Sequence, residues 1–314
     1  MGTPEFARQP LVALCESRHE LLAVVTGPDK VAGRGHKVIQ TPVRIEAERR
    51  GLTVFTPARL KDEALHSSLD RLKADLFVVI AFRILPESLY QLPRLGSINV
   101  HGSLLPAYRG AAPINWAIIN GDNETGLTSF FLKKDVDTGD MILQEKTPIR
   151  PDDTYDSLAE SMSRMAGEFL LRTLDRIEQG SVSVVPQDDR QASLAPKLTP
   201  FNSMIDWGFP AVNVRNFVRG LCSKPGAYTY FRGKRVKVLD CLIDDGASAA
   251  TARPGTIVLD KRRLLVQCGR GVVELTRLVP EGKGEMSGTA FLNGYRPRPD
   301  EVIGDLSMGE EKKA

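Results

Sequence analysis

The sequence has few cysteines and histidines, and their arrangement excludes several classes of protein. Its four cysteines, Cys15, Cys222, Cys241 and Cys268, lie far apart and form no paired spacing, so neither a zinc ribbon nor a disulfide framework is expected. The four histidines do not fall into an HExxH motif or another metal-ligand spacing. We therefore expect reduced thiols and no bound metal.

Long apolar runs and nucleotide-binding loops are also lacking. No segment reaches the roughly 18 consecutive apolar residues that cross a membrane, and the first residues lack the basic start and apolar core of a secretory signal. Neither a G-x-G-x-x-G loop after a strand nor a G-x-x-x-x-G-K-[ST] loop occurs, so a dinucleotide or ATP site is not expected. We expect a cytoplasmic protein with no membrane partner.

The chain contains two segments of different character, as its length of 314 residues already suggests. Through residues 1–187, apolar strands alternate with amphipathic helices, which predicts an α/β domain with a mostly parallel, Rossmann-like sheet. Residues 188–204 are polar and interrupted by prolines, which is typical of a linker. Short alternating strands and glycine turns in residues 205–308 predict a small β-barrel.

The two segments also differ in charge. Residues 1–204 hold 24 basic and 26 acidic side chains, whereas residues 205–314 hold 18 basic and 13 acidic ones. The positive excess in the second segment is compatible with a polyanionic partner, although a solvated surface would explain it equally well.

The first residues predict the start of a helix without a strand before it. Thr3 suits the N-cap, Pro4 the first helical position and Glu5 the first turn. Because a strand normally precedes the first helix of a βαβ unit, two alternatives remain. Either the sheet begins at residue 21, or its first strand is missing from this sequence.

Polar residues end the strand predicted around residues 97–101. Asn99 and His101 share one face of it, because side chains two positions apart point the same way, while Ile98 and Val100 point to the other face. Open α/β sheets bind ligands at the carboxyl ends of their strands. The later loop Lys134–Asp140 offers a carboxylate as a third member of this site.

An amide, an imidazole and a carboxylate suit the transfer of an acyl group between two bound substrates. Asn99 can donate a hydrogen bond to a developing oxyanion, and His101 can stabilise the oxyanion or move protons. The carboxylate can orient the imidazole. No serine or cysteine lies in a nucleophile elbow, so we do not expect an acyl-enzyme.

The segments that carry this chemistry resemble the folate-dependent formyltransferases. The matching runs are INVHGSLLPAYRGAAPINW at 98–116, GLTSFFLKKDVDTGDMILQ at 126–144, MGTPEFA at 1–7, GPDKVAGRG at 27–35, AFRILPESL at 81–89, IDW at 205–207 and VPEGKGEMSGTAFLNGY at 279–295. The glycine-rich basic run at 27–35 and the C-terminal pieces are most similar to the members that formylate methionyl initiator tRNA.

The resemblance implies a catalytic trio of Asn99, His101 and Asp137, with Asp135 as an alternative acid. It implies 10-formyltetrahydrofolate as co-substrate and initiator methionyl-tRNA as acceptor, for translation initiation, in a monomer. The implied folate-binding residues are Ser103, Leu104, Leu105, Pro106, Arg83, Ile84, Leu85, Lys134, Asp135 and Val136.

The same resemblance assigns tRNA contacts and a fold to the rest of the chain. Arg34 and Lys37, in a predicted loop over residues 27–40, would approach the acceptor end of the tRNA. The second domain would be an OB-like, tRNA-binding barrel, and a strand would precede the MGTPEFA segment. Two rival functions remain open: a formyltransferase acting on an amino-sugar nucleotide, and a non-catalytic RNA-binding protein.

Overall fold

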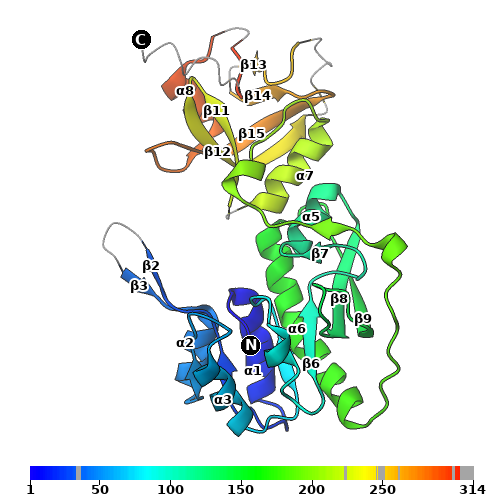
Figure 1. The fold of residues 1–314 in the computed structure, drawn as a ribbon. Coiled ribbons are helices and arrows are strands. Elements are labelled where there is room, and N and C mark those ends of the chain that lie inside the picture. Colours follow the sequence, from blue (N-terminus) through cyan, green and yellow to red (C-terminus); the bar gives the residue numbers. More distant parts are fainter. Residues whose placement is uncertain are drawn as a thin grey trace. The chain divides into compact units, whose positions relative to one another are not determined.

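The computed structural model describes residues 1–32, 37–222, 225–244, 246, 252–260, 262–298 and 301–304. The chain divides into two compact units (Figure 1). The N-terminal unit comprises Met1–Pro113, Glu124–Pro148 and Ser157–Pro196, and the C-terminal unit comprises Ile114–Asn123, Ile149–Asp156 and Lys197–Ala314. The domain limits predicted from the sequence stay a prediction.

The N-terminal unit alternates short strands with helices. Its helices are η1 (Glu5–Ala7), α1 (Arg8–Cys15), α2 (Pro42–Arg49), α3 (Glu63–Arg71), α4 (Glu87–Tyr90), α6 (Tyr155–Glu178) and η2 (Asp189–Gln191). Its strands are β1 (Val24–Val25), β2 (Lys30–Ala32), β3 (Lys37–Ile39), β4 (Val54–Phe55), β5 (Phe77–Val79), β6 (Ser97–His101), β7 (Arg109–Gly110), β8 (Glu124–Phe131), β9 (Met141–Pro148) and β10 (Leu194–Ala195).

The sheet of this unit contains both parallel and antiparallel strands. The ladders β1–β4 and β5–β6 are parallel, as predicted. In the four-stranded sheet β5-β6-β8-β9, however, β8 runs antiparallel to both β6 and β9. The expectation of a mostly parallel sheet therefore holds only for its first half. The connection between β8 and β9 is short enough to reverse the chain, whereas a parallel neighbour needs a longer crossover.

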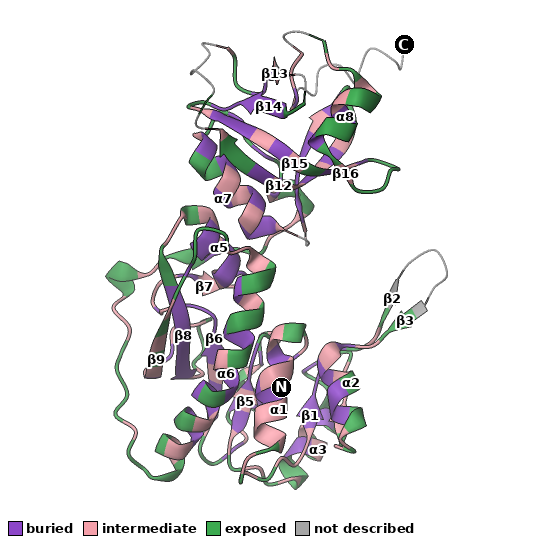
Figure 2. Ribbon diagram, turned by 180° about the vertical axis from the view of Figure 1, so that it is seen from behind, coloured by how far each residue is buried: buried purple, intermediate pink, exposed green. Residues whose placement is uncertain are grey.

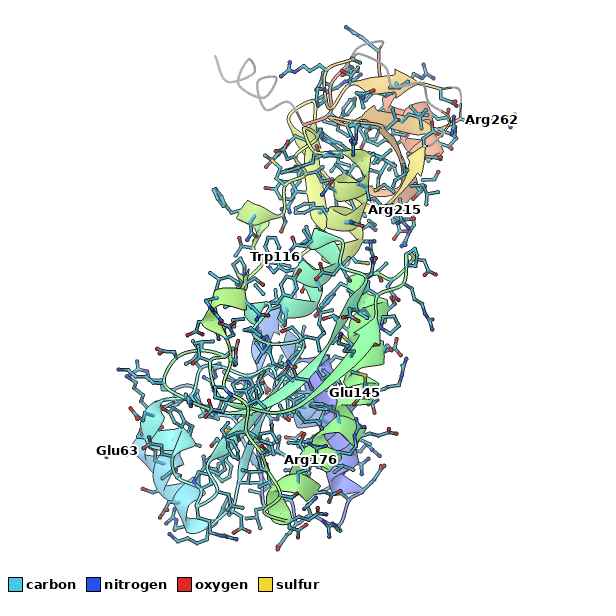
Figure 3. The ribbon with its side chains drawn as sticks, turned by 90° about the vertical axis from the view of Figure 1, so that its right-hand side faces the viewer. Glu63, Trp116, Glu145, Arg176, Arg215 and Arg262 are labelled. Atoms are coloured by element: carbon cyan, nitrogen blue, oxygen red, sulfur yellow. The ribbon has the colours of Figure 1, made fainter. Side chains whose placement is uncertain are left out.

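Helix α6 covers one face of the antiparallel half of this sheet. The Thr173 hydroxyl on α6 donates to the Ser129 hydroxyl on β8 at 3.0 Å, and Arg172 on α6 forms an ion pair with Glu145 on β9. Figure 3 labels Glu145 on β9 and Arg176 on α6. Figure 2 shows β6 and β8 as buried strands. This packing buries the face of β8 that carries Ser129, which lies opposite Val100 of β6 and not opposite Asn99 or His101.

The helix predicted at the chain start is present, but its cap differs from the prediction. The η1 turn begins after Pro4, which makes no side-chain capping bond. The Thr3 hydroxyl instead accepts a hydrogen bond from the Gly27 amide at 3.2 Å. Thr3 therefore ties the first turn to the segment after β1 and does not cap the helix.

Met1 and Gly2 lie between the two parallel ladders. The Gly2 amide donates to Val25 O at 3.0 Å, and the Ile80 amide donates to Met1 O at 2.9 Å. The amino group of Met1 donates to Val78 O at 2.6 Å. Met1 and Gly2 therefore form backbone hydrogen bonds to the segment of β1 on one side and to the segment of β5 on the other, as a strand between them would.

A cavity of about 630 Å³ continues from this point between β1 and β5. Its lining is largely apolar and includes Leu11, Leu14, Val24, Phe77 and Leu174. The alternative in which a strand precedes Met1 stays a prediction, and this cavity, flanked by two strands, supports it.

The predicted loop over residues 27–40 contains regular structure. Strands β2 and β3 pair antiparallel, with Lys30 opposite Ile39 and Val31 opposite Val38. The loop prediction was therefore wrong for these two strands. Arg34 lies outside the described residues, and Lys37 belongs to β3 but its side chain is not among those described.

The C-terminal unit is built on an antiparallel sheet in the order β11-β12-β15-β14-β13, with β16 paired to β15. Its helices are α5 (Pro113–Asn120), α7 (Ala211–Leu221) and α8 (Gly288–Tyr295), and η3 spans Pro200–Asn202. Its strands are β11 (Ala227–Phe231), β12 (Lys234–Asp244), β13 (Ile257–Leu259), β14 (Leu264–Gln267), β15 (Val272–Pro280) and β16 (Met286–Ser287). The predicted change to strands joined by turns is confirmed, and the OB-like barrel stays a prediction.

Apolar side chains of α7 and α8 close the core of this sheet. Val214, Val218 and Leu221 of α7 are buried in one cluster with residues of the sheet. The Phe291 ring of α8 stacks on Tyr295 and meets Phe231 of β11 edge to face. The unit thus has a hydrophobic core of its own.

Candidate active site

Strand β6 sets the positions of Asn99 and His101. Asn99 lies opposite Val79 of β5 and Phe130 of β8, and His101 lies opposite Thr128 of β8. Because β6 has partners on both sides, its register fixes which face each side chain occupies. The two polar side chains therefore share a face, as predicted from their spacing.

The hydrogen bond of His101 defines its tautomer. Its Nε2 lies 2.9 Å from the Tyr108 carbonyl oxygen, and a carbonyl can only accept, so Nε2 carries a hydrogen. Its Nδ1 lies 3.7 Å from Oδ2 of Asp137. The side chains of His101 and Asp137 are only 7% and 10% exposed. Nδ1 is therefore the ring nitrogen that faces the carboxylate.

Asp137 occupies a strained position at the tip of the β8–β9 connection. Its φ of 56° lies in the left-handed region, which residues with a Cβ seldom adopt. Its Oδ2 accepts a hydrogen bond from the Gly110 amide at 2.8 Å. The structure thus brings Asp137 to His101, whereas the alternative acid, Asp135, is exposed.

Gly139 allows this connection to lie flat on β8. A Cβ at this position would lie 1.7 Å from the Phe131 carbonyl oxygen and 2.8 Å from the Phe130 ring. Real Cβ contacts never come so close, so only glycine fits here. The close approach holds the backbone near Asp137 against the strand.

Asn99 has a buried polar atom without a partner. Its Oδ1 is buried and makes no hydrogen bond within the part of the chain that the structure describes. Buried amide atoms nearly always have a partner, and the oxygen and nitrogen of an amide are assigned only from their surroundings. A substrate carbonyl or amine at this position fits the side chain, because an amide can donate as well as accept.

The predicted folate segment from Ser103 to Pro106 forms a rigid loop. The Ser103 hydroxyl donates to Ala107 O at 2.6 Å, and the Thr128 hydroxyl donates to Ser103 O at 2.7 Å. The Leu105 amide in turn donates to the Thr128 hydroxyl at 3.0 Å. The Ser103 hydroxyl, the Ser103 carbonyl and the Leu105 amide are thus engaged inside the protein.

The other predicted folate residues lie in different environments. Arg83 donates to Pro57 O at 2.8 Å and to Ala58 O at 3.0 Å, so its guanidinium bridges to the segment after β4. Ile84 is 75% exposed, and Leu85 is buried in the core. Lys134, Asp135 and Val136 are exposed. The folate-binding role of these residues stays a prediction.

Several residues that hold the site were not predicted from the sequence. They are Tyr108, Gly110 and Thr128, which bond to His101, Asp137 and the folate loop, and Arg109, Gln144 and Gln187 around them. Tyr108, Arg109 and Gly110 lie within the matching run at 98–116, which is a usable signal. Gln187 carries no local pattern that would single it out.

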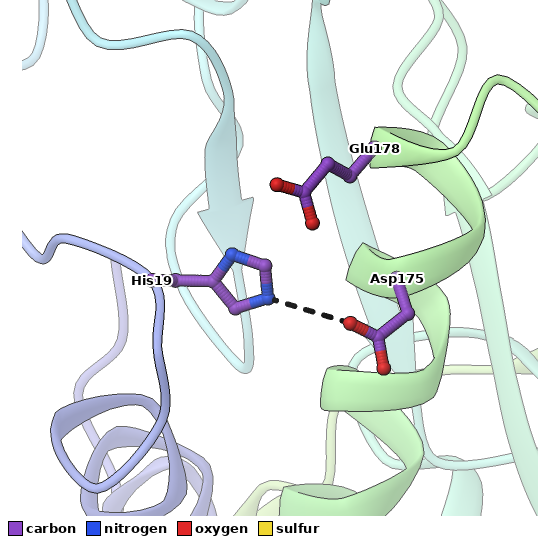
Figure 4. Close-up of side chains that lie close together, drawn as sticks. All are labelled: His19, Asp175 and Glu178. Atoms are coloured by element: carbon purple, nitrogen blue, oxygen red, sulfur yellow. Dashed lines mark ion pairs between the residues drawn. The ribbon is translucent and has the colours of Figure 1, made fainter.

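A second cluster of polar groups lies away from this site. His19, Asp175 and Glu178 place potential metal-ligand atoms within 4.8 Å of one another (Figure 4). Arg18 already bonds both carboxylates, to Asp175 Oδ1 at 2.7 Å and to Glu178 Oε2. The guanidinium thus supplies the positive charge that a metal would bring, and the absence of a metal stays a prediction.

Comparison with known proteins agrees with this geometry. A family model described as formyl transferase matches residues 1–174, and a formyl transferase C-terminal domain matches residues 197–296. The methionyl-tRNA formyltransferase of Chlorobium luteolum is 43% identical over 96% of this chain and 97% of its own length. That of Citrifermentans bemidjiense is 41% identical over 98% of this chain and 97% of its own length.

A solved structure shows the same fold. The N-formyltransferase from Helicobacter canadensis, in complex with folinic acid and dTDP-3-aminofucose, aligns with a TM-score of 0.64 at 18% identity. The alignment covers 87% of this chain and 97% of that protein. The chain belongs to the formyl transferase family, a family of group-transfer enzymes. Within that family it belongs with the methionyl-tRNA formyltransferases, the group that contains the two relatives named above.

Proposed function

We propose that the protein transfers the formyl group of 10-formyltetrahydrofolate to the α-amino group of methionine on initiator tRNA, with Asn99, His101 and Asp137 as the catalytic residues. The observation that carries the proposal is the buried approach of His101 Nδ1 to Asp137 Oδ2 at 3.7 Å, beside an Asn99 amide atom that has no partner within the described chain. No residue of this set serves as a nucleophile, so the amine attacks the formyl group directly.

The reaction conserves protons without a metal or redox step. The methionine nitrogen forms a bond to the formyl carbon, and the formyl oxygen takes the electron pair of its double bond. The oxygen then returns this electron pair to the carbon and re-forms the double bond, while the bond from the formyl carbon to the folate nitrogen breaks and its electrons stay on that nitrogen. That folate nitrogen gains one proton, and the methionine nitrogen loses one.

Each catalytic residue has a distinct part in this step. The Asn99 amide donates to the formyl oxygen as negative charge develops there, and protonated His101 adds positive charge nearby. Asp137 orients the imidazole and accepts the proton of the amine, through water where the distance requires it. A distance of 3.7 Å exceeds that of a direct hydrogen bond, and such contacts commonly shorten in a substrate complex.

The folate would lie along the loops that surround these residues. We assign Ser103, Leu104, Leu105 and Pro106 to one wall, and Arg83, Ile84 and Leu85 to a second wall. Lys134, Asp135 and Val136 would close the site from the β8–β9 connection. Exposed Ile84 and Val136 support this assignment, because apolar side chains that face water are available to cover a pterin.

The C-terminal unit would bind the tRNA as an OB-like domain. The excess of basic over acidic residues after residue 204 supports this role, because phosphates supply most of the affinity for a nucleic acid. Arg34 and Lys37 would contact the acceptor end. The enzyme would act as a monomer in the cytoplasm. In the part of the chain that the structure describes, no helix is long and apolar enough to cross a bilayer.

The decisive experiment offers two acceptors in separate reactions with 10-formyltetrahydrofolate: methionyl initiator tRNA and an amino-sugar nucleotide. We expect formylmethionyl-tRNA from the first and no product from the second. Asn99→Ala and His101→Ala should each lower turnover by about 10²–10⁴-fold. Formyl transfer to the amino-sugar nucleotide alone would show that the acceptor is the amino sugar and not methionyl-tRNA. Salt-sensitive tRNA binding without formyl transfer would instead support an RNA-binding protein.

A further inference from the structure

The Gln187 side chain connects two loops of the candidate active site. Its Nε2 donates to the carbonyl oxygens of Asp137 at 2.9 Å and of Gly139 at 2.8 Å. Its Oε1 accepts from Arg109 Nε at 3.0 Å and from Nη2 at 2.8 Å. Every hydrogen-bonding position of the amide is therefore used.

Arg109 fixes the direction of this amide. A guanidinium only donates and a backbone carbonyl only accepts, so the oxygen of Gln187 must face Arg109 and its nitrogen must face Asp137 and Gly139. Arg109 is held in turn by Asp189, whose Oδ1 lies 2.7 Å from its Nη2. The arrangement leaves the amide one orientation.

The segment that carries Gln187 is itself attached to the loop after His101. Strand β10 pairs in parallel with β7, so that Leu194 lies opposite Arg109 and Ala195 opposite Gly110. The Ser193 hydroxyl accepts from the Tyr108 amide at 2.9 Å. The same short segment thus holds both the loop after His101 and the backbone of Asp137.

Two independent contacts then define where the Asp137 carboxylate lies. The Gly110 amide holds its Oδ2, and Gln187 holds its carbonyl oxygen. Residues with a Cβ seldom adopt the left-handed conformation of Asp137, so the loop needs such contacts to keep it. Without Gln187 the backbone could leave this conformation and withdraw the carboxylate from His101.

We propose that Gln187 is a positioning residue that acts on catalysis through Asp137. It does not touch the reacting groups, and its effect is to keep Oδ2 of Asp137 facing Nδ1 of His101. The proposal rests on the proposed function, because it assumes that Asp137 works with His101 during formyl transfer.

The substitution Gln187→Glu tests this role with almost no change of shape. The carboxylate still accepts from Arg109, but it cannot donate to Asp137 or Gly139 and repels their carbonyl oxygens. We expect kcat to fall by roughly 10–100-fold, because a displacement of about 1 Å can cost 10²-fold in rate. The KM for methionyl-tRNA and the melting temperature should stay close to the wild-type values.

The matched control is Gln191→Glu, which makes the same change in the same segment. Gln191 is exposed and bonds only Asp188 among the contacts described, at 3.1 Å. We expect its kcat to equal that of the wild type. An equal loss in both variants would show that charge in this segment, and not the contact with Asp137, lowers the rate.

A double variant separates positioning from a purely structural role. If Gln187 acts through Asp137, adding Gln187→Glu to Asp137→Asn should not lower kcat further than Asp137→Asn does alone. Multiplied losses, or a Gln187→Glu enzyme with wild-type kcat, would overturn the proposal. An inactive wild-type protein would instead refute the proposed function, so the two failures are distinguishable.

Discussion

Nδ1 of His101 lies 3.7 Å from Oδ2 of Asp137, although the two residues belong to different strands and loops. Both side chains are nearly buried, so the carboxylate is available to the imidazole and largely shielded from water. The site thus depends on the charge of Asp137 as well as on its shape.

Asp137→Asn should retain the shape and remove this charge. We expect kcat to fall by about 10²–10⁴-fold, because the amide neither accepts a proton nor stabilises a protonated imidazole. Single-turnover formyl transfer to methionyl-tRNA measures the effect. Asp140→Asn in the same loop, where the side chain pairs with Lys133, is the control and should remain active. Equal rates for Asp137→Asn and the wild type would show that Asp137 has no catalytic role.

Gly139→Ala should displace the β8–β9 connection. Its Cβ would lie 1.7 Å from the Phe131 carbonyl oxygen, which belongs to a paired strand and cannot move freely. We expect a loss of about 2–4 kcal/mol in the free energy of unfolding, together with loss of activity. Urea unfolding of this variant is compared with Gly284→Ala, where a Cβ meets no atom within 4 Å. Similar free energies of unfolding for the two variants would contradict the close approach of Gly139 to Phe131.

Glu46→Gln should produce a pH-dependent loss of stability. Hydrogen bonds from Arg49 and Arg50, each 2.6 Å from Glu46 Oε1, lower the pKa of its carboxyl group to about 2 from 4.5. A lowered pKa in the folded state adds stability above pH 4.5, and this stability disappears as the pH falls towards 2. We expect a loss of about 1–2 kcal/mol at pH 7, after allowance for solvent screening.

The measurement for Glu46 is the melting temperature of both proteins across that pH range. The difference between them should shrink steadily from pH 5 to pH 2. Glu124→Gln, at an exposed ion pair with Lys146, serves as control and should change little at any pH. A difference that does not vary with pH would show that the arginines do not stabilise the Glu46 carboxylate.

An apolar extension before Met1 should fill the cavity between β1 and β5. A segment of roughly 5 apolar residues, the usual length of a strand, would bury its side chains in the cavity and pair with both β1 and β5. We expect the melting temperature to rise by several degrees. A glycine-serine extension of equal length is the control, and equal melting temperatures for the two extensions would contradict a strand in this cavity.

The gain from this extension should also depend on pH. Burial lowers the pKa of the Met1 amino group to about 5 from 8.0. The unextended protein therefore loses stability as the pH falls from 8 to 5, because its folded state resists protonation of this group. An extended chain has a peptide bond there, so the difference in melting temperature should widen over the same range.

The local pattern of the sequence predicted the strand with its two polar residues correctly. Alternation along Ser97–His101 is a property of a few consecutive residues, and the period of a strand decides which of them share a face. The start of the first helix was predicted correctly as well, because it too depends on a few consecutive residues. Its cap was wrong, because the Thr3 hydroxyl bonds to Gly27 on a distant segment instead.

The sequence by itself determined the residue types of the site, the alternation that places Asn99 beside His101, and the change to strands joined by turns in the last third of the chain. Only the tertiary structure decided that Asp137 and not Asp135 meets His101, that β8 runs antiparallel, and that Gln187 holds the loop. The physical reason is that these contacts join residues far apart in the chain. Their geometry follows from strand register, loop closure and packing, which no local window of sequence contains.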